Sequence, residues 1–412
     1  MDTLYACCAG LDVHKKTVAA CVRRLGTNGK VRKEVRIFGT MTVHLLAMAD
    51  WLAQEGVTHV AMESTGVYWK PIFNLLEGRF QVLLVNPQHM KRVPGRKTDV
   101  KDCEWIAQLL QCGLLQPSFI PPLWQRQLRE LTRQRVQLVG QRAAVVNRIQ
   151  KTLEDANIKL ASVATDILGK SGRAMIQALI AGQEDPEILA KLARGKLQKK
   201  MAPLQSALQG RITEHHRFLL QLLLEQVDSL DRFIKRLDER IGELAVPFDE
   251  DLKRLDTIPG VNRRAAECLI AEVGVDMETF PSAANLASWA GLCPGKRESA
   301  GKSQGGTIRK GNRWLRRLLV QAAWAASRKK GSYLRAQYRR LAARRGGKRA
   351  VVAVAHTLLV IGYHILKRKV GYQDLGETYF ERLDPEQLTR SLVHRLERLG
   401  HRVILQPEDN AA

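Results

Sequence analysis

The apolar run at residues 81–85, QVLLV, limits what this chain can fold into more than any other feature. A continuous apolar run is expected of a central strand whose two faces are both covered by other elements. Farther upstream, the turn-formers Gly26, Asn28 and Gly29 separate two more β-prone runs, as in a hairpin. The start of the chain is therefore expected to be an α/β structure.

The first 115 residues predict a definite order of elements. Hairpin-linked β-prone runs come first, and apolar residues at helical spacing follow. The expected elements are strands at 5–13, 17–22 and 31–38, a helix at 42–54, a strand at 59–62, a helix at 68–76 and the strand at 81–85. Thr98 can then cap a further helix. The order βββαβαβ followed by a helix resembles that of ribonuclease-H-like folds.

Four carboxylates fall at definite places in this order. Asp12 lies in the first strand, Glu63 ends the fourth, and Asp99 and Asp102 share one face of the last helix at spacing i and i+3. Clustered carboxylate oxygens suit Mg²⁺ or Mn²⁺, and two such ions could activate a nucleophile and stabilise a leaving oxygen at phosphorus. We expect the neighbouring His14 to be a surface or supporting group.

A plainer interpretation exists for each acid taken alone. Asp99 and Asp102 could only serve the helix dipole, and Glu63 at a strand end is neutral evidence. Asp12 is harder to explain, because an acid in an apolar strand costs several kcal/mol unless it is paired or binds metal. The joint placement favours a metal site.

Positive charge indicates the class of partner. The 412 residues carry a formal net charge of +25, which points to phosphate backbones and to salt-dependent binding. Residues 296–349 hold 18 lysines and arginines against one acid, Glu298, and so contribute +17. The candidate nucleic-acid contacts in this segment are Lys302, Arg309, Lys310, Arg313, Arg316 and Arg317.

Cysteine usage and hydropathy indicate the compartment. The seven cysteines are odd in number and lack CxxC spacing, which argues against a disulfide framework or a zinc site. We see no signal peptide and no apolar run of about 18 residues, so no membrane partner is expected. The expected location is the cytoplasm, in association with the nucleoid.

The middle of the chain predicts a helical arm. One helix is expected at 124–156 and a second at 203–246, with short helices at 162–200 between them. The second carries a heptad seam. The seam residues are Leu220, Leu223, Val227, Leu230, Ile234, Leu237, Ile241 and Leu244. Two interpretations stay open: a hairpin of two helices within one chain, or a coiled coil between protomers of a dimer or tetramer.

Two features follow the arm. Residues 255–274 resemble a helix-hairpin-helix motif whose turn could offer backbone N–H groups to a phosphate, although an ordinary helical connection would look similar. Residues 295–311 form a Gly-rich basic loop that leads into a helix near Asn312. Ser299, Ser303 and Thr307 are candidates for phosphate contact, but a serine in such a loop is usually only a hydrogen-bond donor.

A family resemblance now becomes visible. The motifs that carry it are GLDVHKKTVAACV, HVAMESTGVYWKPIFNLLE, VPGRKTDVKDCEWIAQLL, DTIPGV and the stretch from ASWAGLCPG to RKGNRWLR. In this order they resemble the insertion-sequence 110-type transposases, also called DEDD transposases, from about residue 4 to at least residue 365. The family pattern implies a RuvC-like domain that uses Asp12, Glu63, Asp99 and Asp102. It also implies a nucleophilic serine in an SGGK-like loop, which aligns with Ser299 although Ala300 replaces the first glycine.

The resemblance implies a DNA transposase or recombinase that cleaves and exchanges strands through a covalent link between Ser299 and DNA. Members act as homo-oligomers, and some are directed by a structured non-coding RNA. The expected domains are a RuvC-like domain at 1–120, a coiled-coil arm at 121–250, a transposase domain at 251–350 and a helical tail at 351–412. Two alternatives remain: a junction-resolvase-like nuclease that uses water, and a non-enzymatic nucleic-acid-binding scaffold.

Overall fold

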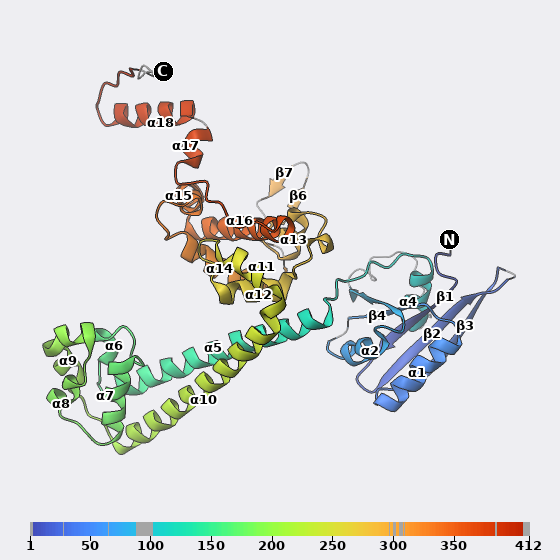
Figure 1. Ribbon diagram of the computed structural model, residues 1–412, viewed down its shortest axis with the longest axis horizontal. Helices are drawn as coiled ribbons and strands as arrows, with labels where there is room; N and C mark the ends of the chain where they lie inside the picture. The colour runs from blue at the N-terminus through green and yellow to red at the C-terminus, as the bar shows by residue number, and fades with distance from the viewer. Residues whose placement is uncertain are drawn as a thin grey trace. The chain divides into compact units, whose positions relative to one another are not determined.

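The computed structural model describes residues 3–27, 29–64, 66–87, 102–295, 297–299, 302–304, 308, 310–383 and 385–406. The chain divides into two compact units, Met1–Pro121 and Pro122–Ala412 (Figure 1). The first contains a mixed sheet with helices, and the second is mostly helical.

A five-stranded sheet forms the centre of the first unit, with strand order β3-β2-β1-β4-β5. The strands are β1 (Cys7–Val13), β2 (Thr17–Leu25), β3 (Val31–Gly39), β4 (His59–Glu63) and β5 (Gln81–Val85). The first three are antiparallel neighbours, whereas β4 runs parallel to β1 and β5 runs parallel to β4. The predicted order of elements up to β5 is confirmed.

Helices cover both faces of this sheet. On one face, alternate residues of β1, such as Leu11, pack against α1 (Thr42–Gln54) and α2 (Trp69–Leu76). On the other face, Cys8 packs against α4 (Asp102–Gln111), which Figure 1 shows on the side away from α1. The two layers hold the strand ends of the sheet in place from both sides.

The position of β5 corrects one prediction. Both faces of this strand are covered, since Leu84 packs with the α1 and α2 layer and Val85 with the α4 layer. The strand is nevertheless at an end of the sheet order and not at its centre. The segment after α4 covers its outer side, because Val85 pairs with Pro117 and the Ser118 N–H donates to the Leu84 carbonyl at 2.7 Å. An edge strand covered in this way is as apolar as a central one.

Two long helices, α5 (Leu123–Asp155) and α10 (Glu214–Ala245), form a hairpin in the second unit. Ion pairs join them along their length, including Arg142 to Asp231 at 2.5 Å. The short elements between them pack on the same core: α6 (Leu160–Val163), α7 (Lys170–Ile180), α8 (Pro186–Lys191), η1 (Gly195–Lys200) and α9 (Met201–Leu208) (Figure 1). The within-chain hairpin is therefore confirmed, and association between protomers stays a prediction.

The predicted helix at 203–246 is wrong in its first part, because α9 ends at Leu208 and α10 begins at Glu214. Gly210 lies so close to the end of α5 that a Cβ there would be 2.4 Å from the Ala156 carbonyl oxygen. The Arg211 N–H donates to the same oxygen at 2.8 Å. Thr213 then caps α10 in a capping box with His216, so a new helix starts there.

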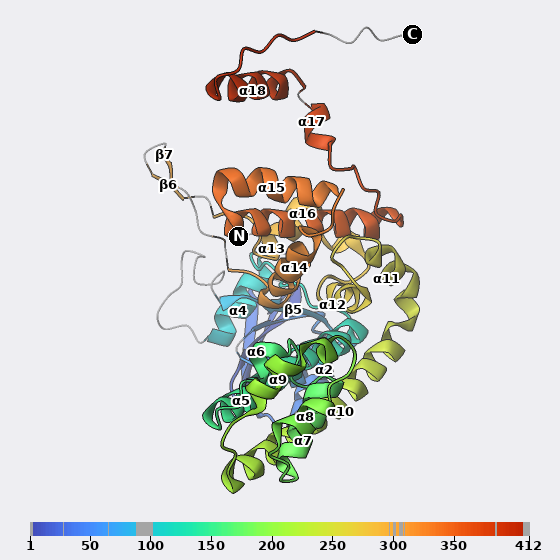
Figure 2. The same cartoon turned by 90° about the vertical axis from the view of Figure 1, so that its left-hand side faces the viewer.

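The rest of the second unit is a helical core. Its elements are η2 (Val246–Phe248), α11 (Asp249–Asp256), α12 (Arg263–Val273), η3 (Met277–Thr279), α13 (Ala283–Trp289), α14 (Arg313–Ala326), α15 (Tyr333–Arg345) and α16 (Gly347–Arg368). Figure 2 shows α13, α14 and α15 gathered around α16. The tail contains α17 (Tyr379–Leu383) and α18 (Pro385–Arg398).

Helix α16 is long and apolar enough to cross a membrane, by length and composition alone. A buried helix of a folded core passes the same test, and residues such as Val354, Leu358 and Leu359 of α16 are buried in this core.

Candidate active site

Two of the predicted carboxylates lie on adjacent strands. In the parallel pairing of β1 with β4, Leu11 stands beside Met62, and the next residues on the two strands are Asp12 and Glu63. Residues in register on parallel strands point to the same face, and both strands reach their carboxyl ends here. The side chain of Asp12 is 24% exposed and Glu63 is half-buried. The sheet therefore presents two neighbouring carboxylates at one edge.

Gly10 brings a helix onto that face. A Cβ on Gly10 would lie 2.3 Å from the Ala107 nitrogen and 2.4 Å from the Cys103 carbonyl oxygen, so only glycine lets α4 approach β1 this closely. Since alternate strand residues share a face, Asp12 is on the α4 side of the sheet. The charge of Asp12 also contributes to raising the pKa of the Cys103 thiol, after burial and Glu104. Asp12 thus lies near the first turn of α4.

Asp102 is the first residue of α4 and is exposed. Asp99, the fourth predicted carboxylate, lies outside the described residues, and so does the predicted cap Thr98. Within the described part of the chain, no three His, Cys, Asp or Glu side chains form a group that could hold a metal ion. The donor chemistry of Asp12, Glu63 and Asp102 still fits Mg²⁺ or Mn²⁺, because every donor is a hard carboxylate oxygen.

Other polar groups nearby have their own partners. The exposed His14 ring is 3.2 Å from the Asp12 carboxylate, which places it beside the site, as expected of a supporting group. Glu104 is held by Lys33 at 2.6 Å. Burial raises the pKa of the Cys8 and Cys21 thiols to about 12, so neither offers a thiolate ligand near neutral pH.

Ser299 belongs to the second unit. It ends the short strand β6 (Arg297–Ser299), which pairs with β7 (Lys302–Gln304) so that Ser299 is opposite Lys302. The side chains of these two strands are outside the description. The two chain segments at the base of the loop lie close together, since a Cβ on Gly311 would be 2.4 Å from the Gly291 nitrogen. The predicted loop therefore contains a small hairpin that leaves the helical core through a narrow base.

The predicted basic contacts follow this hairpin. Lys310, Arg313 and Arg317 are exposed and Arg316 is half-buried, whereas Arg309 lies outside the described residues. Helix α14 starts where the sequence predicted, with Asn312 as its cap. Leu315 and Leu319 are buried in the helical core, Leu318 is half-buried against it, and Trp314 is half-buried.

A buried acid that the sequence did not reveal anchors the end of this loop. Glu272, at the end of α12, is only 3% exposed. Its carboxylate accepts two hydrogen bonds from Arg133, at 2.7 and 2.8 Å, and one from the Asn312 amide at 2.6 Å. Arg129 donates to the backbone carbonyl of Glu272 at 2.7 Å. Glu272 thus ties α5 and α12 to the residue at which the loop becomes α14.

The predicted helix-hairpin-helix segment consists of α11, a turn and α12. The Gly260 backbone, with φ of +85°, lies against α14, and a Cβ there would be 2.3 Å from the Ala322 carbonyl oxygen. Ile258 and Val261 are buried in the core. The side chain of Asn262 caps α12 by accepting from the Ala265 N–H at 2.9 Å. Part of the turn therefore serves helix packing.

Comparison with known proteins identifies the class of protein. A family model described as "Transposase", of the DEDD IS110 group, matches residues 9–158. A second, described as "Transposase IS116/IS110/IS902 family", matches residues 252–339. The first match contains all four predicted carboxylates, and the second contains Ser299.

Individual relatives agree with these matches. The chain is 28% identical over 299 residues to the transposase for insertion sequence element IS1111A of Coxiella burnetii, which covers 70% of this chain and 72% of the relative. It is also 28% identical over 268 residues to an uncharacterized 42 kDa protein of insertion element IS900 of Mycobacterium paratuberculosis, with 58% and 66% covered. The chain belongs to the IS110-type transposase family.

Proposed function

We propose that this transposase cleaves and exchanges DNA strands at a metal site built on the ends of β1 and β4. The observation that supports this most is the placement of Asp12 beside Glu63, under the helix that starts at Asp102. The strand order resembles that of ribonuclease-H-like nucleases, and we infer a RuvC-like fold for the first unit. Asp12, Glu63, Asp99 and Asp102 would hold Mg²⁺ or Mn²⁺, which stabilises developing charge at phosphorus.

Ser299 is the proposed nucleophile. Its hydroxyl oxygen forms a bond to phosphorus and loses its proton, one P–O bond to a neighbouring sugar breaks, and a free DNA hydroxyl leaves. A DNA hydroxyl then attacks the serine phosphodiester, which rejoins the strand and restores the serine. Asp12 and Ser299 belong to different compact units. The proposal therefore requires the units of one chain, or of two chains, to meet on DNA.

The family resemblance supplies the rest of the proposal. A homo-oligomer would act on the element ends and on the target, directed by a structured non-coding RNA of the element. The positive charge of residues 296–349 supports binding of a phosphate backbone. The site of action would be the nucleoid, in the cytoplasm.

Recombination between a donor and a target plasmid in the presence of Mg²⁺ tests this function. Asp12→Asn and Ser299→Ala should each abolish recombination while DNA binding persists, because neither change removes a basic side chain. Wild-type protein and Ser303→Ala should form a covalent adduct with DNA that survives SDS, and Ser299→Ala should form none. Full strand cleavage by Ser299→Ala would favour a nuclease that uses water, and full activity of Asp12→Asn would exclude the metal site.

A further inference from the structure

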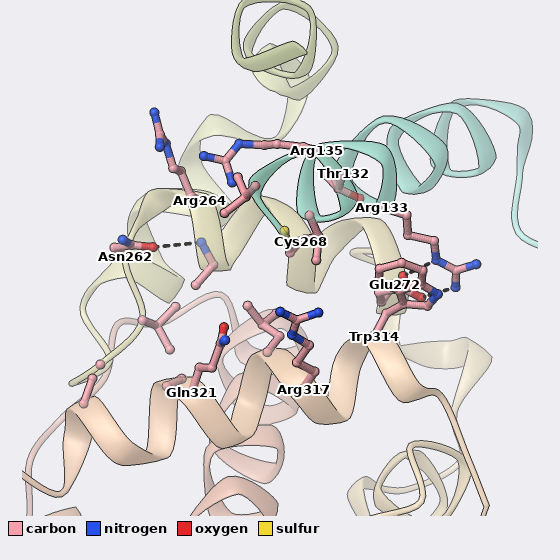
Figure 3. A pocket seen from close by; sticks show the side chains of 18 residues that line it. Thr132, Arg133, Arg135, Asn262, Arg264, Cys268, Glu272, Trp314, Arg317 and Gln321 are labelled. Atoms are coloured by element: carbon pink, nitrogen blue, oxygen red, sulfur yellow. Dashed lines mark hydrogen bonds and ion pairs between the residues drawn. The ribbon is translucent and has the colours of Figure 1, made fainter. Parts of the chain in front are cut away.

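A cleft of about 670 Å³ opens within the second unit between α5, α12 and α14 (Figure 3). This volume is within the roughly 300–1,000 Å³ of pockets that bind small ligands. Residues from all three helices and from the turn before α12 line it. The proposed strand chemistry uses none of its side chains apart from Arg317, a predicted backbone contact.

Cations surround the opening. Arg317 points from α14 into the cleft in Figure 3, is exposed, and has no ion-pair or hydrogen-bond partner among the described residues. On the opposite side, Arg135 and Arg264 share the single carboxylate of Asp238. Arg133 is paired with Glu272. The pairs leave a net positive charge, so a ligand of this cleft carries negative charge.

Part of the cleft lining is apolar. Val136 and Val139 of α5 and Leu318 and Ala322 of α14 contribute to this lining. Val139 is apolar and yet 41% exposed. Many of the residues around it in α5 are arginine or glutamine. An apolar surface beside unneutralised cations suits a ligand with a flat apolar part next to an anionic group.

We propose that this cleft binds one unpaired nucleotide, with its base against Val139 and Leu318 and its phosphate at Arg317. The choice of nucleic acid as the ligand rests on the proposed function. Base-paired duplex does not fit as well, because its bases are stacked inside and only phosphates would reach the arginines. An unpaired base can turn out of its strand and lie against apolar side chains. Either DNA or RNA can supply this nucleotide.

Binding of the full-length protein to labelled oligonucleotides tests the proposal. The probes are a single strand that contains one 2-aminopurine and the same strand paired in a duplex, each as DNA and as RNA. Arg317→Gln should lower the slope of log affinity against log salt by about 0.7 on the single strand, the value for one lost phosphate contact. Val139→Asn should weaken single-strand binding about fivefold or more without changing that slope, and should leave duplex binding unchanged.

Matched controls separate the cleft from general charge and surface effects. Arg232→Gln removes the same charge from an exposed position of α10 that does not line the cleft and is not among the predicted nucleic-acid contacts. Leu222→Asn removes an apolar side chain of similar exposure, 47%, from α10. Both controls should leave the 2-aminopurine signal of the bound single strand unchanged, whereas Val139→Asn should remove it. The DNA and RNA arms show which strand supplies the base.

Three outcomes would overturn the proposal. One is an equal effect of Arg232→Gln and Arg317→Gln on single-strand binding. Another is a wild-type protein that binds duplex but no single strand, which would leave the proposed function intact. The third is that Arg317→Gln and Val139→Asn change the oligomeric mass but leave nucleic-acid binding unchanged. The cleft would then be a contact between protein chains. A wild-type protein that binds no nucleic acid would instead contradict the proposed function.

Discussion

Gly10 shows how one residue positions the candidate active site. Its missing side chain lets α4 approach β1 next to Asp12, with backbone atoms of α4 where a Cβ would be. A glycine inside an apolar strand is a sequence signal for close backbone approach, so this residue could have been singled out beforehand. Glu272 gave no such signal, because its partners Arg133 and Asn312 are 139 and 40 residues away in the chain.

Gly10→Ala should displace α4 and disturb the site. We expect the first unit to lose about 1–3 kcal/mol of stability, as for an overpacked core, and DNA cleavage to fall more than DNA binding. Gly140→Ala is the control, because a Cβ at this position of α5 meets nothing within 4 Å, and it should be neutral or stabilise by up to about 1 kcal/mol. Urea unfolding followed by tryptophan fluorescence measures both. An unchanged midpoint for Gly10→Ala would show that α4 does not pack on β1 this closely.

At the scale of elements, periodicity predicted most strands and helices but not their neighbours. The QVLLV run correctly predicted a strand with both faces covered. Its position in the centre of the sheet was predicted wrongly, because residues 115–118 cover the outer side of this edge strand and allow it to be as apolar as a central one. The break between α9 and α10 was missed because the approach of Gly210 to Ala156 is a tertiary contact. The heptad seam predicted α10 but could not distinguish a partner helix in the same chain from one in another chain.

The arm provides a test at this scale. Val227 is fully buried in the core shared by α5 and α10, so Val227→Asp leaves an unpaired charge that costs on the order of 3–5 kcal/mol. We expect circular dichroism to show lost helicity. Phe233→Asp, at a position of the same helix that is 47% exposed, should keep it. Retained helicity with a lower mass by light scattering in Val227→Asp would instead assign this position to a contact between chains.

At the scale of the whole molecule, the proposed catalytic residues belong to two different compact units. The proposed carboxylates lie before Pro121, and Ser299 and the basic segment lie after it. The sequence predicted these residues because each motif is local. The proposed assembly of these residues into one site would depend on how the units meet on nucleic acid, so local motifs cannot predict it. A split site would allow assembly on DNA to control the chemistry.

Binding of Mn²⁺ to the full-length protein, followed by electron paramagnetic resonance, measures the metal site most directly. We expect Asp12→Asn and Glu63→Gln each to weaken Mn²⁺ binding by at least about tenfold. Glu104→Gln should bind as the wild type does, because Lys33 already holds that nearby carboxylate. Equal Mn²⁺ affinity in the wild type, Asp12→Asn and Glu63→Gln would contradict a metal site on the ends of β1 and β4.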